Sequence, residues 1–414
     1  MTPASETTPA ARFAAFRHRP FLAYWAARFL TTFATQIVSV AVGWQIYDLT
    51  RDPFDLGIVG IVQFLPSLLL VLVTGAVSDR VGRRLVMGIA SALEMLCSLA
   101  LLALALGGNH AGPLPIFAVL AAFGLARASF GPASSSLVAN LVPAEDFANA
   151  VAWNSSAWQM ATIVGPVAGG LLYGLSETAA YGTAAALMAA ATLLIFAIPK
   201  PTQRSRMEGP ALEMLFAGFR YIWSEKVVLG AISLDLFAVL LSGASALLPV
   251  YARDILDLGP WGLGLLRSAP GIGAICVAVW LAGHPIRDHA GIVMLAFVGF
   301  FGAFTVLFGL STATWLSIAA LALLGATDMI SVYVRETLIQ LWTPDHVRGR
   351  VNAVNQVFVG ASNEVGEFRA GTMAALIGTV PAVVIGGVGA VAVAGLWAVL
   401  FPQLRRIRRL DGRV

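Results

Sequence analysis

Charged residues are scarce in this chain. Of its 414 residues, 12% are charged and 58% are hydrophobic. Soluble globular domains carry about 25% charged residues. The composition therefore excludes a soluble globular protein and predicts a polytopic membrane protein.

Cysteine and histidine are also rare, with two and five copies. Cys97 and Cys276 both lie inside apolar runs, where a thiol usually packs as a small hydrophobic group, and the histidines form no cluster with metal-ligand spacing. We therefore expect no disulfide, no metal and no cofactor. The phosphate-binding pattern G-x-x-x-x-G-K-[ST] is absent, which argues against an ATP-driven pump. The basic residues are not gathered in one patch, so no nucleic-acid partner is expected.

What the chain does have is a series of long apolar runs. About 20 helical residues cross the ~30 Å hydrocarbon core of a bilayer. The longest internal polar segment divides the runs six and six, which predicts an N-terminal six-helix bundle at 1–199, a cytoplasmic linker with an amphipathic helix at 200–227 and a C-terminal six-helix bundle at 228–414. The twelve predicted transmembrane helices are 22–47, 56–77, 85–106, 115–138, 147–175, 181–198, 228–251, 262–283, 291–310, 314–341, 351–378 and 381–402.

The distribution of lysine and arginine predicts the orientation. If both chain ends are cytoplasmic, 19 of the 26 lysines and arginines lie on the cytoplasmic side, and only Arg51 and Arg253 lie outside. Short loops rich in these residues stay in the cytoplasm. We therefore predict a multi-pass protein of the bacterial inner membrane with both termini cytoplasmic.

The two halves of the chain repeat each other. A shift of 201 positions places Pro143 on Pro344 and Asn154 on Asn355. Parallel six-helix repeats are an architecture of secondary transporters. The alternative is a chance match within a glycine-rich chain.

One short charged segment separates the second and third predicted helices. It reads GAVSDRVGRR at 75–84. The pattern G-x-x-x-D-R-x-G-R-R resembles the loop 2–3 signature of the major facilitator superfamily at every motif position. This resemblance implies an all-α fold of two pseudo-symmetric six-helix bundles, and it implies transport of a small molecule by alternating access and not catalysis.

The resemblance also implies a cytoplasmic gate. In the superfamily, the aspartate of this loop meets the amino end of helix 11 when the cytoplasmic side is closed, and free N–H groups and the helix dipole favour an anion there. Here the aspartate is Asp79, and its partner would be Arg348 or Arg350. The repeat suggests a second pair, between Arg287 and an acidic residue before helix 5. The alternative is that these are solvated loop charges worth ~0–1 kcal/mol each. The gating candidates are Asp79, Arg80, Arg83, Arg348, Arg350, Arg287, Glu145 and Asp146.

Ionisable side chains inside the predicted helices indicate the transport chemistry. An ion within the bilayer is costly unless it has a partner or water. Glu364 and Glu367 share one face of a helix and repel each other when both are ionised, which makes either one a candidate proton carrier. The alternative is a structural network in which they pair with a neighbouring arginine. The proton-coupling candidates are Glu364, Glu367, Asp328, Asp235 and Glu94.

Polar and aromatic residues in the same helices are candidates for a substrate cavity. Arg127 matches Asp328 in the repeat, and Trp158 offers an aromatic surface. The alternative for the aromatic residues is packing or anchoring at the membrane interface. The cavity candidates are Arg28, Gln36, Arg127, Asn154, Trp158 and Asn355.

Two further stretches resemble one branch of the superfamily. The segment at 161–170, ATIVGPVAGG, is similar to the exporter motif G-x-x-x-G-P-x-x-G-G with alanine in the first position. The segment at 348–371, RGRVNAVNQVFVGASNEVGEFRAG, resembles the enterobactin-exporter-like branch, which also includes drug:proton antiporters. This implies proton-driven export of a siderophore or drug by a monomer in the lipid bilayer. The alternatives are metabolite uptake, lysophospholipid flipping or a non-transporting sensor.

Overall fold

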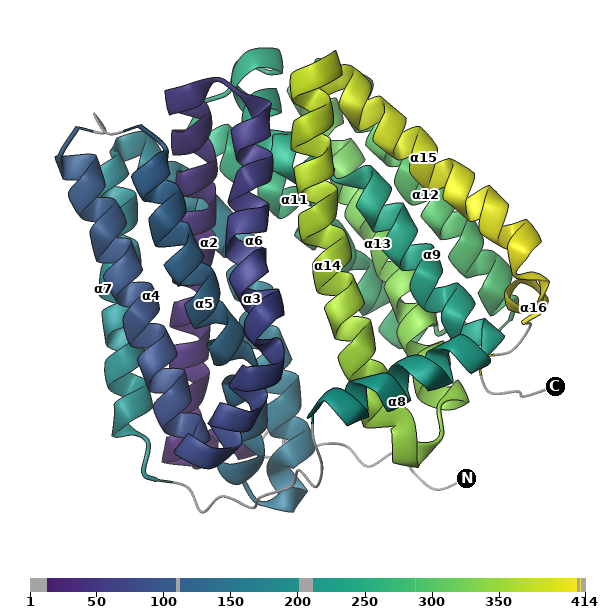
Figure 1. The fold of residues 1–414 in the computed structure, drawn as a ribbon, viewed down its shortest axis with the longest axis horizontal. Helices are drawn as coiled ribbons and strands as arrows, with labels where there is room; N and C mark the ends of the chain where they lie inside the picture. Colours follow the sequence, from purple (N-terminus) through teal and green to yellow (C-terminus); the bar gives the residue numbers. More distant parts are fainter. Residues whose placement is uncertain (1–12, 109–111, 201–210, 287, 408–409, 411–414) are drawn as a thin grey trace. The chain divides into compact units, whose positions relative to one another are not determined.

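The computed structural model describes the backbone of residues 13–108, 112–200, 211–286, 288–407 and 410, and the side chains of these residues apart from 70–80, 211–215 and 346. The regular structure of this part of the chain is helical, with no strand, so the all-α prediction is confirmed (Figure 1). The chain divides into two compact units. One consists of Met1–Ala41 and Leu65–Glu208, and the other of Val42–Phe64 and Gly209–Val414.

The first unit holds most of the first two long helices and all of the next four. Apolar side chains of five of these helices form its core, in which Phe21, Tyr24 and Met87 have no exposed surface. The long helices are α2 (Arg19–Thr50), α3 (Pro53–Val81), α4 (Arg83–Leu106), α5 (Leu114–Leu137), α6 (Phe147–Leu175) and α7 (Glu177–Ala197), and the short ones are η1 (Ala14–Arg17), η2 (Val138–Asn140) and η3 (Ala144–Asp146).

Small residues let α6 approach α2 closely. A Cβ atom on Gly169 would lie 2.9 Å from the Cα atom of Ile37, and one on Gly165 would collide with the side chain of Gln36. Both glycines belong to the segment that resembles the exporter motif. Close helix packing therefore explains why glycine occupies these two positions.

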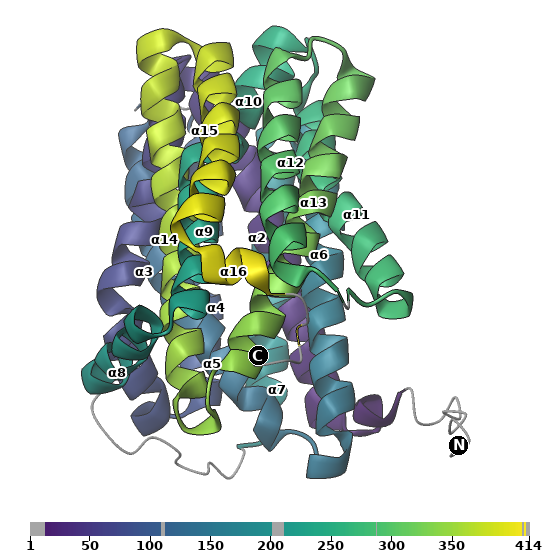
Figure 2. The same cartoon turned by 90° about the vertical axis from the view of Figure 1, so that its right-hand side faces the viewer.

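The second unit contains the remaining helices. Figure 2 shows α16 turning across the end of α15 toward α12, and α16 contacts both helices. The helices are α8 (Ala211–Ser224), α9 (Lys226–Ser242), η4 (Ala244–Leu247), α10 (Leu248–Val250), the π-helix η5 (Tyr251–Ile255), α11 (Pro260–Gly283), α12 (Ala290–Leu310), α13 (Thr314–Trp342), α14 (Asp345–Ile377), α15 (Thr379–Leu400) and α16 (Pro402–Arg406).

Nine helices of the described chain are long and apolar enough to cross a bilayer. They lie at nine of the predicted spans. The long helices α3, α6 and α14 lie at the other three. Ionisable residues, among them Glu364, Glu367 and Arg369, make α14 more polar than its neighbours.

The seventh predicted span, 228–251, lies within the membrane-spanning segment Lys226–Ile255, which consists of several consecutive helices. α9 ends at Ser242 because Gly243 adopts a left-handed conformation with φ of 48°, and η4, α10 and η5 follow. Arg369 of α14 satisfies the open end of α9, since its guanidinium group donates to the carbonyl oxygens of Leu240, at 3.0 Å, and Leu241. The break is therefore stabilised by a cation that caps the C-terminus of α9.

The joined ends of α2 and α3 belong to the second unit. A Cβ atom on Gly57 would lie 3.0 Å from the carbonyl oxygen of Phe368, and one on Gly371 would lie 2.7 Å from that of Pro53. Glycines on both α3 and α14 thus allow the two backbones to meet. The predicted domain limits follow the order of the chain, whereas the compact units interleave at residues 42–64.

The helix α8 lies in the predicted linker region and crosses one end of α14 (Figure 1). Gly218 makes this crossing possible, because a Cβ atom there would lie 2.6 Å from the carbonyl oxygen of Arg350. Ile222 is buried, whereas Phe216 and Trp223 are exposed. The helix therefore has one packed face and one apolar exposed face.

We expect Gly243→Ala to destabilise the protein by about 1–3 kcal/mol, because it combines a positive φ with a collision. Its Cβ atom would clash with the carbonyl oxygen of Gly366 and lie 2.9 Å from the Cβ atom of Ala370. The apparent melting temperature of the protein purified in detergent, followed by tryptophan fluorescence, measures the effect. Gly395→Ala is the matched control, because a Cβ atom there meets nothing within 4 Å. Equal melting temperatures for the two variants would contradict this account of the break.

Candidate functional site

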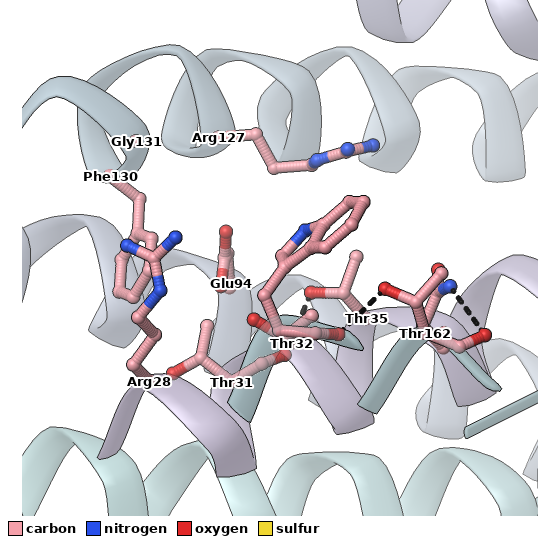
Figure 3. A pocket seen from close by; sticks show the side chains of 11 residues that line it. Arg28, Thr31, Thr32, Thr35, Glu94, Arg127, Phe130, Gly131 and Thr162 are labelled. Carbon is pink, nitrogen blue, oxygen red and sulfur yellow. Dashed lines mark hydrogen bonds between the residues drawn. The ribbon is translucent and has the colours of Figure 1, made fainter. Parts of the chain in front are cut away.

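A polar pocket of about 290 Å³ lies within the first unit. Helices α2, α4, α5 and α6 contribute its walls, and five sequence-predicted residues, Arg28, Gln36, Glu94, Arg127 and Trp158, are among the lining side chains (Figure 3). The other lining residues are Thr31, Thr32, Thr35, Phe130, Gly131 and Thr162. We call this the first-unit pocket.

Hydrogen bonds hold Arg28 at one side of the first-unit pocket. Its Nη1 atom donates to the hydroxyl oxygen of Ser134 at 2.7 Å. The Tyr24 hydroxyl group donates to the Ser134 carbonyl oxygen at 2.9 Å and lies 3.0 Å from the same Ser134 hydroxyl. Asn154 stands behind this group and does not line the pocket, since its Oδ1 atom accepts from the Tyr24 hydroxyl at 3.3 Å.

Glu94 places a carboxyl group in the same pocket. Only 1% of this residue is exposed, and its Oε2 atom has no hydrogen-bond partner in the described part of the chain. The cationic side chain that attracts it is Arg127. In the view of Figure 3, Glu94 of α4 lies between Arg28 of α2 and Arg127 of α5.

A second pocket, of about 180 Å³, lies within the second unit at the break after α9. We call it the second-unit pocket. Asp328 of α13 and Glu367 of α14 both line it, and Ser242 and Ser245 border it on either side of Gly243. The other lining residues are Val239, Ala244, Leu248, Pro270, Phe301, Leu321, Leu324 and Asn363.

Glu364 and Glu367 converge on Gly60. A Cβ atom on this glycine would lie 3.0 Å from an oxygen of Glu364 and 3.5 Å from an oxygen of Glu367. Arg267 of α11 is electrostatically attracted to Glu367. This geometry is compatible with both sequence-based alternatives, since Glu367 lines a pocket and also has a nearby arginine.

Asp235 lies in an ion pair. Its carboxylate binds the Nη1 atom of Arg335, and these residues are 9% and 4% exposed. The Nε atom of Arg335 lies 3.9 Å from Glu336, which accepts a hydrogen bond from Asn355 at 3.0 Å. Asp235 and Asn355 thus belong to one polar network, and neither lines the two pockets described above.

Three of the predicted gating residues, Arg83, Asp146 and Arg348, have local partners. Arg83 donates to the Ser136 carbonyl oxygen at 3.1 Å, and Asp146 binds His18 at 2.8 Å. Arg348 binds Asp345 at 2.6 Å. Glu145 is exposed and Arg350 is partly buried. The side chains of Asp79 and Arg80, and Arg287 as a whole, lie outside the described residues, so both gate pairs stay predictions.

Sequence reasoning missed a charged cluster where α2 and α3 join. Asp48 binds Arg253 and lies 3.6 Å from Arg51, while Asp254 binds Tyr47 and lies 3.7 Å from Arg51. The guanidinium group of Arg253 also lies 5.4 Å from the ring centre of Trp44. Arg51 and Arg253 are the two basic residues that the topology places outside, each close to an aspartate in the sequence. An arginine beside an aspartate in two loops predicted on the same side of the membrane was the pattern from which this cluster could have been predicted.

The residues that the structure describes contain no group of three or more His, Cys, Asp or Glu side chains that could hold a metal ion. Five of their charged residues, Arg28, Glu94, Arg127, Asp328 and Glu367, line pockets inside bundles of membrane-spanning helices. Such pockets define a class of protein, the carriers that move small molecules across membranes.

Comparison with known proteins gives the family. The chain belongs to the transmembrane secretion effector family of the major facilitator superfamily, whose profile matches residues 10–412. This confirms the family resemblance and the major facilitator fold of twelve helices, and it identifies a multi-pass membrane transporter and not an enzyme.

Individual relatives cover nearly the whole chain. It is 26% identical to the enterobactin exporter EntS of Escherichia coli O1:K1 / APEC over 405 residues, which is 96% of this chain and 95% of the relative. It is 27% identical to the enterobactin exporter EntS of Citrobacter koseri over 402 residues, 94% of each chain. A bacterial homologue of the human lysosomal transporter Spinster, solved in an inward-facing and unoccupied conformation, superposes with a TM-score of 0.72 at 12% identity, covering 96% of this chain and 97% of that one. This last likeness shows the fold alone.

The Asp235–Arg335 pair leads to a stability prediction. Removal of one partner leaves a buried charge uncompensated, so Asp235→Asn should cost about 3–5 kcal/mol, and the double variant Asp235→Leu, Arg335→Met should recover most of this loss. Thermal unfolding of the purified protein measures both effects.

Asp345→Asn is the control, because the Asp345 side chain is 89% exposed and its pairing with Arg348 should be worth about 0–1 kcal/mol. A variant Asp235→Asn that is as stable as this control, but transports no substrate against a gradient, would argue for a coupling role and against a structural one.

Proposed function

We propose that this protein is a proton-coupled exporter of small amphipathic molecules, a siderophore or a drug, in the bacterial inner membrane. Substrate leaves the cytoplasm while protons enter, and access to the binding site alternates between the two sides. The family description as secretion effectors and the two enterobactin exporters at 26% and 27% identity support export as the direction.

The observation that carries this proposal is the presence of carboxyl groups in two pockets inside membrane helices. Glu94 lines the first-unit pocket, and Asp328 and Glu367 line the second-unit pocket. Acidic groups within a membrane protein are expensive, and those that line cavities usually belong to ion or substrate routes. A proton route through this carrier explains the carboxyl groups in both pockets.

Asp328 and Glu367 are the proposed proton carriers. Both border a pocket at the break after α9, where the hydroxyl groups of Ser242 and Ser245 can support changes in charge. Glu364 lies against the same glycine as Glu367, so ionisation of one opposes ionisation of the other. Asp235 has Arg335 as its counter-ion, which supports a structural role.

The energetics are sufficient for export. One proton that enters down 100 mV releases ~2.3 kcal/mol, which at ~1.4 kcal/mol per decade sustains a substrate gradient of roughly 50-fold. A pH difference adds to this value. No nucleotide-binding loop is needed for transport on this scale.

The proposed orientation places both chain ends in the cytoplasm, with the linker 200–227 joining the bundles 1–199 and 228–414. The cytoplasmic gate consists of Asp79 with Arg348 or Arg350, and of Arg287 with Glu145 or Asp146. The carrier works as a monomer. The concentration of arginine in the predicted cytoplasmic loops supports this orientation.

Transport by everted membrane vesicles tests the proposal. The substrate is the metabolite that builds up in a deletion strain and is cleared on complementation. Added to acid-inside vesicles that contain the wild type, it should accumulate roughly 50-fold and release protons. Asp328→Asn or Glu367→Gln should abolish accumulation against a gradient and leave downhill exchange, because coupling is lost while the pathway remains.

Asp345→Asn, with its exposed side chain, should transport as the wild type does. Accumulation that survives both carboxyl substitutions would show that the proton carriers are assigned wrongly. A compound that binds tightly but never accumulates would indicate a sensor and not a carrier.

A further inference from the structure

We propose that the first-unit pocket recognises an oxyanion on an aromatic substrate, and that Arg28 is the residue that binds it. This inference rests on the proposed function, because it names the chemical class of the exported molecule. It follows from the charges of the pocket, from the hydrogen-bonding capacity left unused in it and from its aromatic walls.

Arg28 is a cation without an anionic partner. Among the described residues its side chain forms one hydrogen bond, to the neutral hydroxyl group of Ser134, and no ion pair. A cation within the membrane is costly unless a counter-ion or water compensates it. Asp235 has Arg335, Glu94 has Arg127 and Arg369 caps the carbonyl end of α9, whereas Arg28 has only the Ser134 hydroxyl group.

The guanidinium group is held in a fixed position. Ser134 is fully buried, and its hydroxyl group accepts from Nη1 of Arg28 while it also contacts the Tyr24 hydroxyl at 3.0 Å. Tyr24 is itself fully buried. A chain of two buried residues thus orients the arginine toward the pocket, as expected for a residue whose planar group must match a ligand.

Two donors beside this position have no partner. The Nε atom of Arg28 and the hydroxyl oxygen of Thr31 are both buried, and neither has a hydrogen-bond partner in the part of the chain that the structure describes. Thr31 is 2% exposed. Unsatisfied buried donors are unusual and point to a group that is supplied by a ligand. A carboxylate or phosphate accepts from both.

The acidic residue of the pocket does not compensate Arg28. Glu94 is electrostatically attracted to Arg127. The pocket lining therefore contains two arginines and one carboxyl group, which leaves an excess of positive charge. This excess of positive charge attracts an anionic ligand.

The walls of the pocket identify the rest of the ligand. Trp158 and Phe130 both line it, and their rings offer flat apolar surfaces on which an aromatic molecule can stack. The pocket is amphipathic, because its lining combines the cationic Arg28 with these two aromatic rings. The ligand class is thus an aromatic molecule with a carboxylate, a phosphate or a similar oxyanion.

Binding of four naphthalene probes to the full-length protein in detergent tests this inference. The probes are 1-naphthoate, 1-naphthyl phosphate, 1-naphthalenemethanol and 1-naphthylmethylamine, which share a ring and differ in charge. Calorimetric titration should give the tightest binding for one of the two anions, and which one it is separates a carboxylate from a phosphate. Arg28→Gln should weaken that binding by about tenfold or more, and Arg28→Lys by less, because lysine keeps the charge and loses the planar fork.

Arg405→Gln is the matched control, since this arginine is exposed on α16, and it should bind the anion as the wild type does. Unchanged affinity in Arg28→Gln, or tighter binding of the amine than of both anions, would overturn the assignment. If Arg28→Gln does not fold, Ser134→Ala provides the test. Loss of the hydroxyl group that orients Arg28 should weaken binding of the anionic probe by about threefold or more. Unchanged affinity in that variant would also overturn the inference.

The outcome separates this inference from the proposed function. Vesicles that move nothing uphill, together with anion binding that requires Arg28, would refute the export proposal and leave the anion site standing. Uphill export that persists in Arg28→Gln, together with unchanged affinity for the anionic probe, would refute the anion site and leave the export proposal standing.

Discussion

An ionised side chain in a membrane helix must find a compensating group, and this constraint organises the interior of both units. Asp235 is compensated by Arg335, whereas Glu94 lies in the field of Arg127 and Glu367 in that of Arg267. Each pair joins residues from different helices, so each also fixes how two helices pack. The same electrostatic requirement therefore serves stability in one place and a polar transport route in another.

Backbone groups obey the same constraint where a helix is interrupted. In a bilayer an open helix end must be satisfied within the protein. The break after α9 meets this demand through Arg369, whose guanidinium group reaches the carbonyl oxygens of Leu240 and Leu241. The break can thus exist beside a polar pocket at little cost. Gly243 supplies the positive φ, and the close approach of Gly366 leaves no room for a side chain.

The membrane helices could be predicted because hydrophobic run length and basic loops are local signals. The ion pairs between helices could not be predicted. Arg335 lies 100 positions from Asp235 in the chain, and the spacing of apolar residues does not indicate which helices contact each other. Gly243 could not be recognised either, since one glycine within an apolar run resembles the many that serve packing. For the first-unit pocket, charge within a predicted membrane helix indicated Arg28, Glu94 and Arg127. The sequence could not show that Glu94 lies in the field of Arg127 and that Arg28 has no ion pair.

The charge state of the ligand bears on how export is driven. If Arg28 binds a monoanion, its exit from a negative interior and the entry of one proton both move charge in the favourable direction. Two elementary charges then cross the potential in each cycle, which releases ~4.6 kcal/mol at 100 mV and supports a gradient of roughly 2,000-fold. A neutral substrate would gain only the proton's share. An uncompensated arginine in the pocket therefore does more than select a ligand, since the anion that it selects is also the species that the membrane potential expels most strongly.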